Sequence, residues 1–250
     1  MFERGSGGFE VVRLLAAAIV LSASLFAGTE SCMGADAWGG SLGITSDYIL
    51  RGISRSNEQA ALQLDLHYLK NSGFVAGLYA SDAQYNPHAP RDVELDAYLG
   101  FAWTVGVDWR GKALVSHYAY PWNRAGTEYD YDELTLDAAF REWLNVAVVY
   151  SPDAPRYSPY SERIHVSSQS AEVSVQRPLW RKLSATAGVG YSHYGGPDAQ
   201  GYAYWSVGAA LDLAPVALAL SYINTSAGAK LLFYNAAADD RWTGTVIWRF

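Results

Sequence analysis

Acidic side chains recur at alternate positions of several apolar segments. Glu94 and Asp96 alternate with Val93, Leu95 and Ala97. In an extended chain successive side chains point to opposite faces, so the carboxylates share one face and the apolar side chains the other. A carboxylate-bearing face that encloses water raises the local concentration of cations. The spacing therefore indicates passive attraction of ions rather than covalent catalysis.

The residues predicted to face such an interior comprise eight acids and four bases. They are Asp47, Arg51, Asp65, Glu94, Asp96, Glu133, Asp137, Glu172 and Asp212, joined by Arg110, Lys112 and Arg249, with Tyr98 beside them. One interpretation is a polar, water-filled lumen held by internal salt bridges, because polar interiors are the rule in membrane barrels. The other is a weakly cation-preferring channel, because rings of carboxylates favour cations.

The serines and histidines do not form a catalytic pattern. Ser116 and His117 are adjacent, as are Ser192 and His193, so the members of each pair point to opposite faces of a strand. A phosphate-binding glycine loop, a metal-spaced Cys/His set and a nucleotide fingerprint are also missing from the sequence. We therefore expect no enzyme activity, no catalytic residue, no metal and no cofactor.

The elements that position the acids are strands, because period-2 alternation continues through most of the chain. Twelve segments follow it, at approximately 40–52, 60–69, 74–82, 92–104, 107–120, 130–141, 144–151, 164–177, 183–194, 202–213, 216–224 and 240–250. Short connections alternate with long ones, as in outer-membrane barrels with short periplasmic turns and long extracellular loops. The sequence predicts an all-β fold, a 12-stranded antiparallel transmembrane barrel with an up-and-down meander. Both termini are expected in the periplasm.

The final segment has an aromatic-apolar face that includes Trp242, Trp248 and Phe250. Half-buried strands of soluble sheets also alternate, but aromatics at both ends of an apolar band are typical of a strand that crosses a membrane. We expect these three residues to act as a barrel-closing and assembly signal.

The start of the chain predicts export. An apolar run at 14–27 follows Arg4 and Arg13 and is short for a membrane span, which is typical of a signal peptide. Cleavage is predicted after Ala27 or, preferably, after Ala37, which gives a signal peptide at 1–37 and a barrel domain at 38–250. The single cysteine, Cys32, precedes the preferred site, so no disulfide is expected. A net charge of −7 argues against binding to nucleic acid.

Several ordered motifs carry a family resemblance. They are Ser46-Asp-Tyr-Ile-Leu-Arg-Gly-Ile-Ser54, Ala60-Ala-Leu-Gln-Leu-Asp-Leu-His-Tyr68, Ser72-Gly-Phe-Val-Ala-Gly77, Glu94-Leu-Asp-Ala-Tyr-Leu-Gly100, Tyr118-Ala-Tyr-Pro121, Tyr129-Asp-Tyr-Asp-Glu133 and Trp205-Ser-Val-Gly208. Over about residues 40–250 the chain resembles the TorF-type porins, exported proteins of Gram-negative proteobacteria. The resemblance implies an outer-membrane barrel and brings no catalytic residues. A different fourth hairpin, at 103–109, and an Ala-rich loop before the last strand depart from the pattern.

Together these features predict an outer-membrane, porin-like transport channel for passive diffusion of small polar solutes or ions. The expected partners are outer-membrane lipids, lipopolysaccharide, the barrel assembly machinery and the small solutes themselves. The alternative is a closed barrel that acts as a structural or surface-binding protein through extracellular loops such as 85–90 and 151–160, where aromatics and prolines gather.

Overall fold

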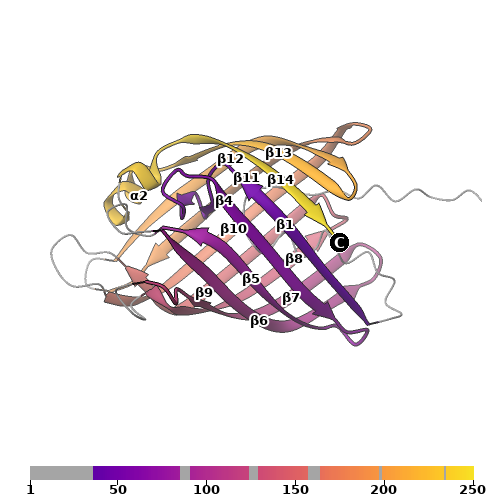
Figure 1. Ribbon diagram of the computed structural model, residues 1–250, viewed down its shortest axis with the longest axis horizontal. Coiled ribbons are helices and arrows are strands. Elements are labelled where there is room, and N and C mark those ends of the chain that lie inside the picture. The colour runs from indigo at the N-terminus through magenta and orange to yellow at the C-terminus, as the bar shows by residue number, and fades with distance from the viewer. Residues whose placement is uncertain (1–35, 85–90, 124–128, 157–163, 197–198, 234) are drawn as a thin grey trace, which may run out of the picture.

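The computed structural model describes residues 36–84, 91–123, 129–156, 164–196, 199–233 and 235–250. Twelve antiparallel strands form a closed barrel, as predicted, and they follow one another around it in chain order (Figure 1). The strands are β1 (Ala37–Thr45), β4 (Ala61–Leu69), β5 (Phe74–Ala83), β6 (Asp92–Val105), β7 (Trp109–Ala119), β8 (Tyr131–Phe140), β9 (Leu144–Arg156), β10 (Ile164–Trp180), β11 (Leu183–Tyr194), β12 (Gln200–Leu213), β13 (Val216–Thr225) and β14 (Arg241–Arg249).

The barrel closes between β1 and β14. Ser41 pairs with Arg249, and Thr45 pairs with Thr245 at the other end of the ladder. Two further backbone hydrogen bonds join Gly40 and Phe250, at 2.9 and 3.0 Å. Because each of the twelve strands pairs with a neighbour on both sides, the barrel has no open sheet edge, as a hydrocarbon environment requires.

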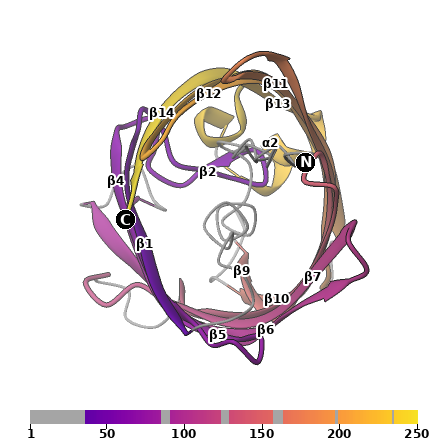
Figure 2. The ribbon, with the colours of Figure 1, turned by 90° about the vertical axis from the view of Figure 1, so that its right-hand side faces the viewer.

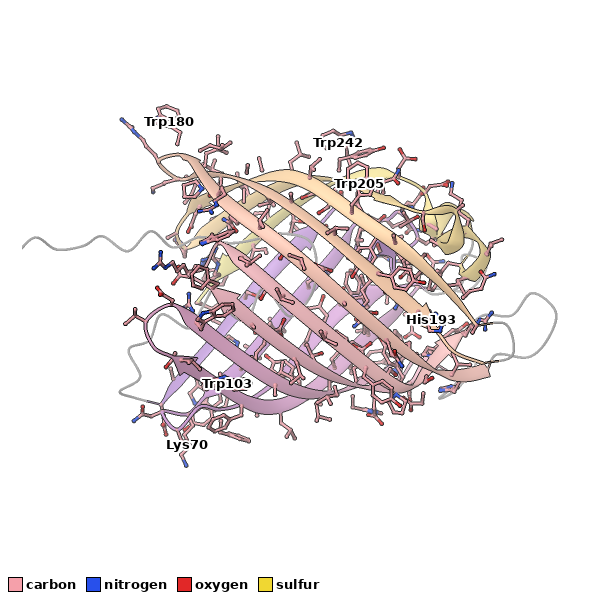
Figure 3. The ribbon with its side chains drawn as sticks, turned by 180° about the vertical axis from the view of Figure 1, so that it is seen from behind. Lys70, Trp103, Trp180, His193, Trp205 and Trp242 are labelled. Carbon is pink, nitrogen blue, oxygen red and sulfur yellow. The ribbon has the colours of Figure 1, made fainter. Side chains whose placement is uncertain are left out.

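The alternation of faces has the predicted phase. On β6, Leu95, Leu99 and Phe101 are exposed, whereas Glu94 and Asp96 are buried inside the barrel. Trp103, Trp205 and Trp242 stand on the outer surface (Figure 3). Such a continuous apolar exterior around a polar interior is the reverse of a water-soluble fold and suits lipid. Among the described residues, no helix has the length and apolar character to cross a bilayer.

The short and long connections alternate, so each kind gathers at its own end of the barrel (Figure 1). The short turns include 70–73, 106–108 and 214–215. The turn between β8 and β9 places both Arg141 and Glu142 at positive φ, 46° and 62°. The C-terminus lies at the end of the short turns, and the helical segment α2 lies at the opposite end.

The predicted first strand at 40–52 is wrong in its second half. β1 ends at Thr45, and residues 46–60 fold into the barrel around a small hairpin of β2 (Ile49–Leu50) and β3 (Ile53–Ser54). The turn places Arg51 and Gly52 at φ values of 50° and 80°. A Cβ on Gly52 would come within 2.7 Å of the Tyr204 side chain, so this turn requires glycine for space as well as for φ. We call residues 46–60 the inner hairpin.

Three other predicted boundaries differ. β9 continues to Arg156 and β10 to Trp180, so 152–156 and 178–180, expected in connections, are strand. The Ala-rich segment before the last strand forms α2 (Ala227–Leu232) and a 3-10 helix, η2 (Asn235–Ala238), where only a loop was predicted. Residues 1–35 of the expected signal peptide, Cys32 included, and the loop tips at 85–90 and 157–160 lie outside the described residues. Ala37, which directly precedes the preferred cleavage site, is the first residue of β1.

Candidate functional site

The structure places the predicted inward residues inside the barrel. Nine of the ten proposed lining residues are less than a tenth exposed, namely Asp47, Arg51, Glu94, Asp96, Tyr98, Glu133, Asp137, Glu172 and Asp212, and the Asp65 side chain is 16% exposed. The bases Arg110, Lys112 and Arg249 also face inward and contact acids. Asp47 and Arg51 reach the interior from the inner hairpin. The prediction that both lie on the first barrel strand, at 40–52, is therefore wrong. Their role in lining a conducting path stays a prediction.

Arg51 extends the inner hairpin across the interior to β8. Its two terminal nitrogens each donate a 2.7 Å hydrogen bond to one carboxylate oxygen of Glu133. Burial by itself would lower the pKa of the Arg51 guanidinium, but the charge and hydrogen bonds of Glu133 outweigh burial and hold that pKa well above its ordinary value. The pair is therefore ionic, bidentate and screened from water, which is the strongest form of an Arg–carboxylate contact.

The opposite wall holds the same turn. The Tyr202 hydroxyl on β12 donates to the Arg51 carbonyl oxygen at 3.1 Å. Gly52 lies against Tyr204 of β12 and Thr225 of β13. The tip of the inner hairpin therefore joins β8 to β12 and β13 across the lumen.

The base of the inner hairpin is bonded to β6 and within itself. The Tyr48 hydroxyl donates to Glu94 of β6 at 2.6 Å, and the Tyr120 hydroxyl donates to the other oxygen of the same carboxylate. Asp47 accepts hydrogen bonds from Ser54 and Ser56 within the inner hairpin, at 2.7 and 2.8 Å. These bonds fix the inner hairpin against β6 and close it on itself.

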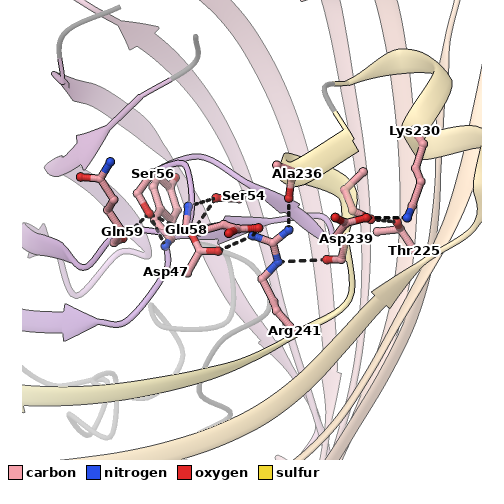
Figure 4. A network of polar contacts seen from close by, with 12 residues as sticks. Asp47, Ser54, Ser56, Glu58, Gln59, Thr225, Lys230, Ala236, Asp239 and Arg241 are labelled. Carbon is pink, nitrogen blue, oxygen red and sulfur yellow. Dashed lines mark hydrogen bonds and ion pairs between the residues drawn. The ribbon is translucent and has the colours of Figure 1, made fainter. Parts of the chain in front are cut away.

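Arg241 connects the inner hairpin to the last long loop (Figure 4). It donates to the Asp47 carboxylate at 2.7 Å, to the Asp239 carbonyl oxygen at 3.0 Å and to the Ala236 carbonyl oxygen. In the view along the barrel, β2 and α2 both lie within the ring of strands (Figure 2). The end of the barrel with the long connections is therefore narrowed by two chain segments that are bonded to each other.

An apolar layer supports this contact. Ile53 of the inner hairpin packs in one buried cluster with Ala229 and Leu232 of α2 and Ala238 of η2. Tyr194, Tyr202 and Tyr204 complete the cluster from β11 and β12. Burying apolar surface between the two segments favours their closed arrangement.

Toward the short turns the interior is polar and ionic. Lys112 and Asp137 pair across β7 and β8 at 3.5 Å, and both side chains are almost completely buried. Asp65 accepts from the Tyr98 hydroxyl at 2.7 Å and contacts the His67 ring at 2.6 Å. At the rim, Arg110 pairs with Glu142, and Arg249 lies 4.0 Å from Asp212.

Several residues of this site were missed by the sequence reasoning. Arg55 and Arg241 add two bases to the interior, and Tyr48, Tyr120 and Tyr202 supply hydroxyls. For the inner hairpin, the available signal was limited to the Arg51-Gly52 step at the end of the predicted first strand, where a glycine permits a turn.

The serine–histidine pairs have the predicted opposite orientations. Ser116 is buried while His117 is exposed and contacts Asp132 at 2.9 Å. Ser192 is buried and shares a 2.8 Å hydrogen bond with Ser170. Within the part of the chain that the structure describes, no three His, Cys, Asp or Glu side chains are grouped so that they could hold a metal ion.

Comparison with known proteins places this barrel in a family. A family model described as "Bacterial protein of unknown function (Gcw_chp)" matches residues 31–249. The chain belongs to this family. A search of curated proteins found no matching sequence.

Solved structures similar to this Gcw_chp chain are outer-membrane porins and channels. The NanC porin aligns with a TM-score of 0.52 and 9% identity over 85% of this chain and 99% of its own. The KdgM porin aligns with a TM-score of 0.51 and 10% identity over 85% of this chain and 99% of its own. An outer membrane channel from Pseudomonas putida F1 aligns with a TM-score of 0.52 and 14% identity over 89% of this chain and 97% of its own. At these identities the likeness establishes the porin-like barrel fold, and these relatives are channels rather than enzymes.

Proposed function

We propose that this Gcw_chp protein is an outer-membrane channel for passive diffusion of small polar solutes or ions, with a weak preference for cations and kinship with the TorF-type porins. The observation that carries the proposal is the charged, hydrogen-bonding interior of a closed barrel whose exterior is apolar. A purely structural barrel needs no such interior, because apolar side chains would fill it at lower desolvation cost. The fold shared with solved porins and channels supports the same conclusion.

The inner hairpin limits the size of the solute. It crosses the lumen between β8 and β12, so any permeating molecule must pass beside Arg51 and Glu133. Both walls of that passage carry charges and hydroxyls, which can replace part of the water shell of a small polar solute. A large or apolar solute has neither the room nor matching contacts.

The cation preference is expected to be weak. Among the described residues, the eight acids predicted to face the interior, Asp47, Asp65, Glu94, Asp96, Glu133, Asp137, Glu172 and Asp212, are accompanied by six bases, Arg51, Arg55, Arg110, Lys112, Arg241 and Arg249. Arg55 and Arg241 thus reduce the acidic excess that the sequence reasoning assigned. A small net negative charge raises the cation concentration only modestly.

The first prediction concerns location. Membrane fractionation should recover the mature chain with the outer membrane, and unboiled samples should migrate differently from boiled ones on a gel, because closed membrane barrels resist detergent until heated. Recovery in the soluble periplasm without a shift on boiling contradicts the proposal.

A second prediction concerns selectivity. Purified protein in planar bilayers should give stable current steps whose reversal potential in a salt gradient favours the cation. Asp65→Asn, Asp96→Asn and Asp137→Asn combined should move the reversal potential toward zero, because field strength in a narrow lumen follows its fixed charge. Asp132→Asn, on the outer face of β8, is the matched control and should leave the reversal potential unchanged. An unchanged preference in the combined variant, with the folded gel band retained, contradicts the assignment.

One observation favours a second candidate, a closed barrel that acts through its outer loops. The inner hairpin is bonded to β6, β8, β12 and the last loop, and its Leu50, Ile53 and Ser56 are almost fully buried. Folded protein that conducts no ions under any voltage would support this candidate over the channel.

A further inference from the structure

Three carboxylates that come together beneath the inner hairpin have unequal partners. Glu94 accepts hydrogen bonds from Tyr48 and Tyr120, and Glu133 accepts from Arg51 and Tyr118. Neither carboxylate oxygen of Asp96 has a hydrogen-bond partner among the residues that the structure describes, although Asp96 is only 2% exposed. An isolated buried carboxylate is costly, so it is stabilised by taking up either a proton or a positive group.

The nearest neighbours of Asp96 across the sheet are tyrosines. Asp96 of β6 pairs with Tyr79 of β5 on one side and with Tyr118 of β7 on the other. The Tyr79 hydroxyl is also buried without a hydrogen-bond partner in the described part of the chain. Side chains at directly opposed positions have Cβ atoms about 4.5–5.5 Å apart, so the two unpartnered groups lie on neighbouring strands of the same inner wall.

The cationic groups near this location do not hydrogen-bond to Asp96. Arg51 is engaged in its bidentate contact with Glu133. Among the residues that the structure describes, no side chain donates a hydrogen bond to either oxygen of Asp96, so this carboxyl group lacks a partner.

We propose that Asp96 and the Tyr79 hydroxyl bind one small monovalent cation, an alkali metal ion or ammonium, in the lumen. The oxygen ligands suit a hard cation. A divalent ion would require more carboxylate oxygens than Asp96 offers. This inference rests on the proposed channel, since it names the point in the lumen where a permeating cation pauses.

The test measures binding rather than conduction. The full, detergent-folded protein is heated in sodium, potassium or ammonium chloride, or in N-methyl-D-glucamine chloride at the same ionic strength, and the unfolding midpoint is read from the boiled-versus-unboiled gel shift. A ligand that binds only the folded state stabilises it in proportion to the logarithm of its concentration. At least one small cation should raise the midpoint by a few degrees over N-methyl-D-glucamine, and the difference should grow with the logarithm of its concentration once that exceeds the dissociation constant.

Two variants locate the effect. Asp96→Asn should abolish the difference between the small cation and N-methyl-D-glucamine, and Tyr79→Phe should weaken it. Asp132→Asn, which changes an exposed carboxylate on the outer face, should keep the full difference. Should Asp96→Asn fail to fold, Tyr79→Phe alone decides, because it removes a single hydroxyl and keeps the ring.

Three results overturn the inference. Equal midpoints in all four salts show that no small cation binds, and a cation effect that survives in both site variants places binding elsewhere. Midpoints that rise only with acidification, equally in every salt, show that Asp96 holds a proton instead of an ion. Because none of these readings uses current, a barrel that conducts nothing can still pass this test, and a conducting barrel can fail it.

Discussion

Arg51→Ala should raise the single-channel conductance severalfold. The substitution removes the only side chain that joins the tip of the inner hairpin to β8 through charged hydrogen bonds, among the residues described. It also leaves Glu133 buried with only the Tyr118 hydroxyl to stabilise it. Breaking one partner of a buried ion pair costs about 3–5 kcal/mol, more than the neutral hydrogen bond from Tyr202 to the Arg51 carbonyl contributes at the tip. The tip of the inner hairpin should then leave its closed position and widen the passage, while the Tyr48–Glu94 and Asp47–Arg241 contacts keep its base in place.

The control for this experiment is Arg110→Ala. Arg110 also faces inward and also pairs with a carboxylate, that of Glu142, but it lies at the rim of the short turns away from the inner hairpin. Its loss should leave the conductance near that of the unmodified protein. If Arg51→Ala conducts no better while its folded gel band is intact, the inner hairpin does not define the narrowest part of the path.

The strands and their faces could be predicted because the signal is local. In β6, the order Glu94, Leu95, Asp96 fixes which side chains point to lipid and which to the interior, whatever the rest of the chain does. The same reasoning placed Lys112, Glu133 and Asp137 correctly inside. The alternation of long and short connections then determined the meander.

The inner hairpin could not be predicted because its signal is not local. Residues 46–52 alternate well enough to continue a strand, and what turns them inward is contact with distant positions. Arg51 bonds to Glu133, which is 82 residues away, and Asp47 bonds to Arg241, which is 194 residues away. The acidic excess was overestimated partly for the same reason, since Arg55 enters the lumen from the inner hairpin. Arg241, by contrast, begins β14 in phase with the inward Thr243, so the local strand pattern already contained the signal for it.

Deletion of Phe250 should lower the amount of folded protein in the membrane severalfold. The backbone N–H of Phe250 donates to the Gly40 carbonyl oxygen, and the Gly40 N–H donates to the Phe250 carbonyl oxygen, so the last residue makes the final pair of closing hydrogen bonds. Its ring also covers Gly40, where a Cβ would come within 2.8 Å of the ring. Trp248 packs beside it, with ring centroids 4.9 Å apart.

The loss acts on closure rather than on the rest of the ladder, because the pairs from Ser41–Arg249 to Thr45–Thr245 remain available. Closing an open sheet must satisfy every edge group before the barrel is stable in lipid, so the final pair has more influence than its hydrogen-bond energy alone suggests. Phe250→Tyr is the matched variant: it retains the backbone pair and an aromatic ring over Gly40, and should fold to the level of the unmodified protein. The intensity of the heat-shifted band in isolated membranes, divided by total protein, gives the folded fraction of the deletion and of Phe250→Tyr. Equal folded fractions for the deletion and for Phe250→Tyr would mean that closure begins elsewhere and that the terminal aromatic carries no assembly signal.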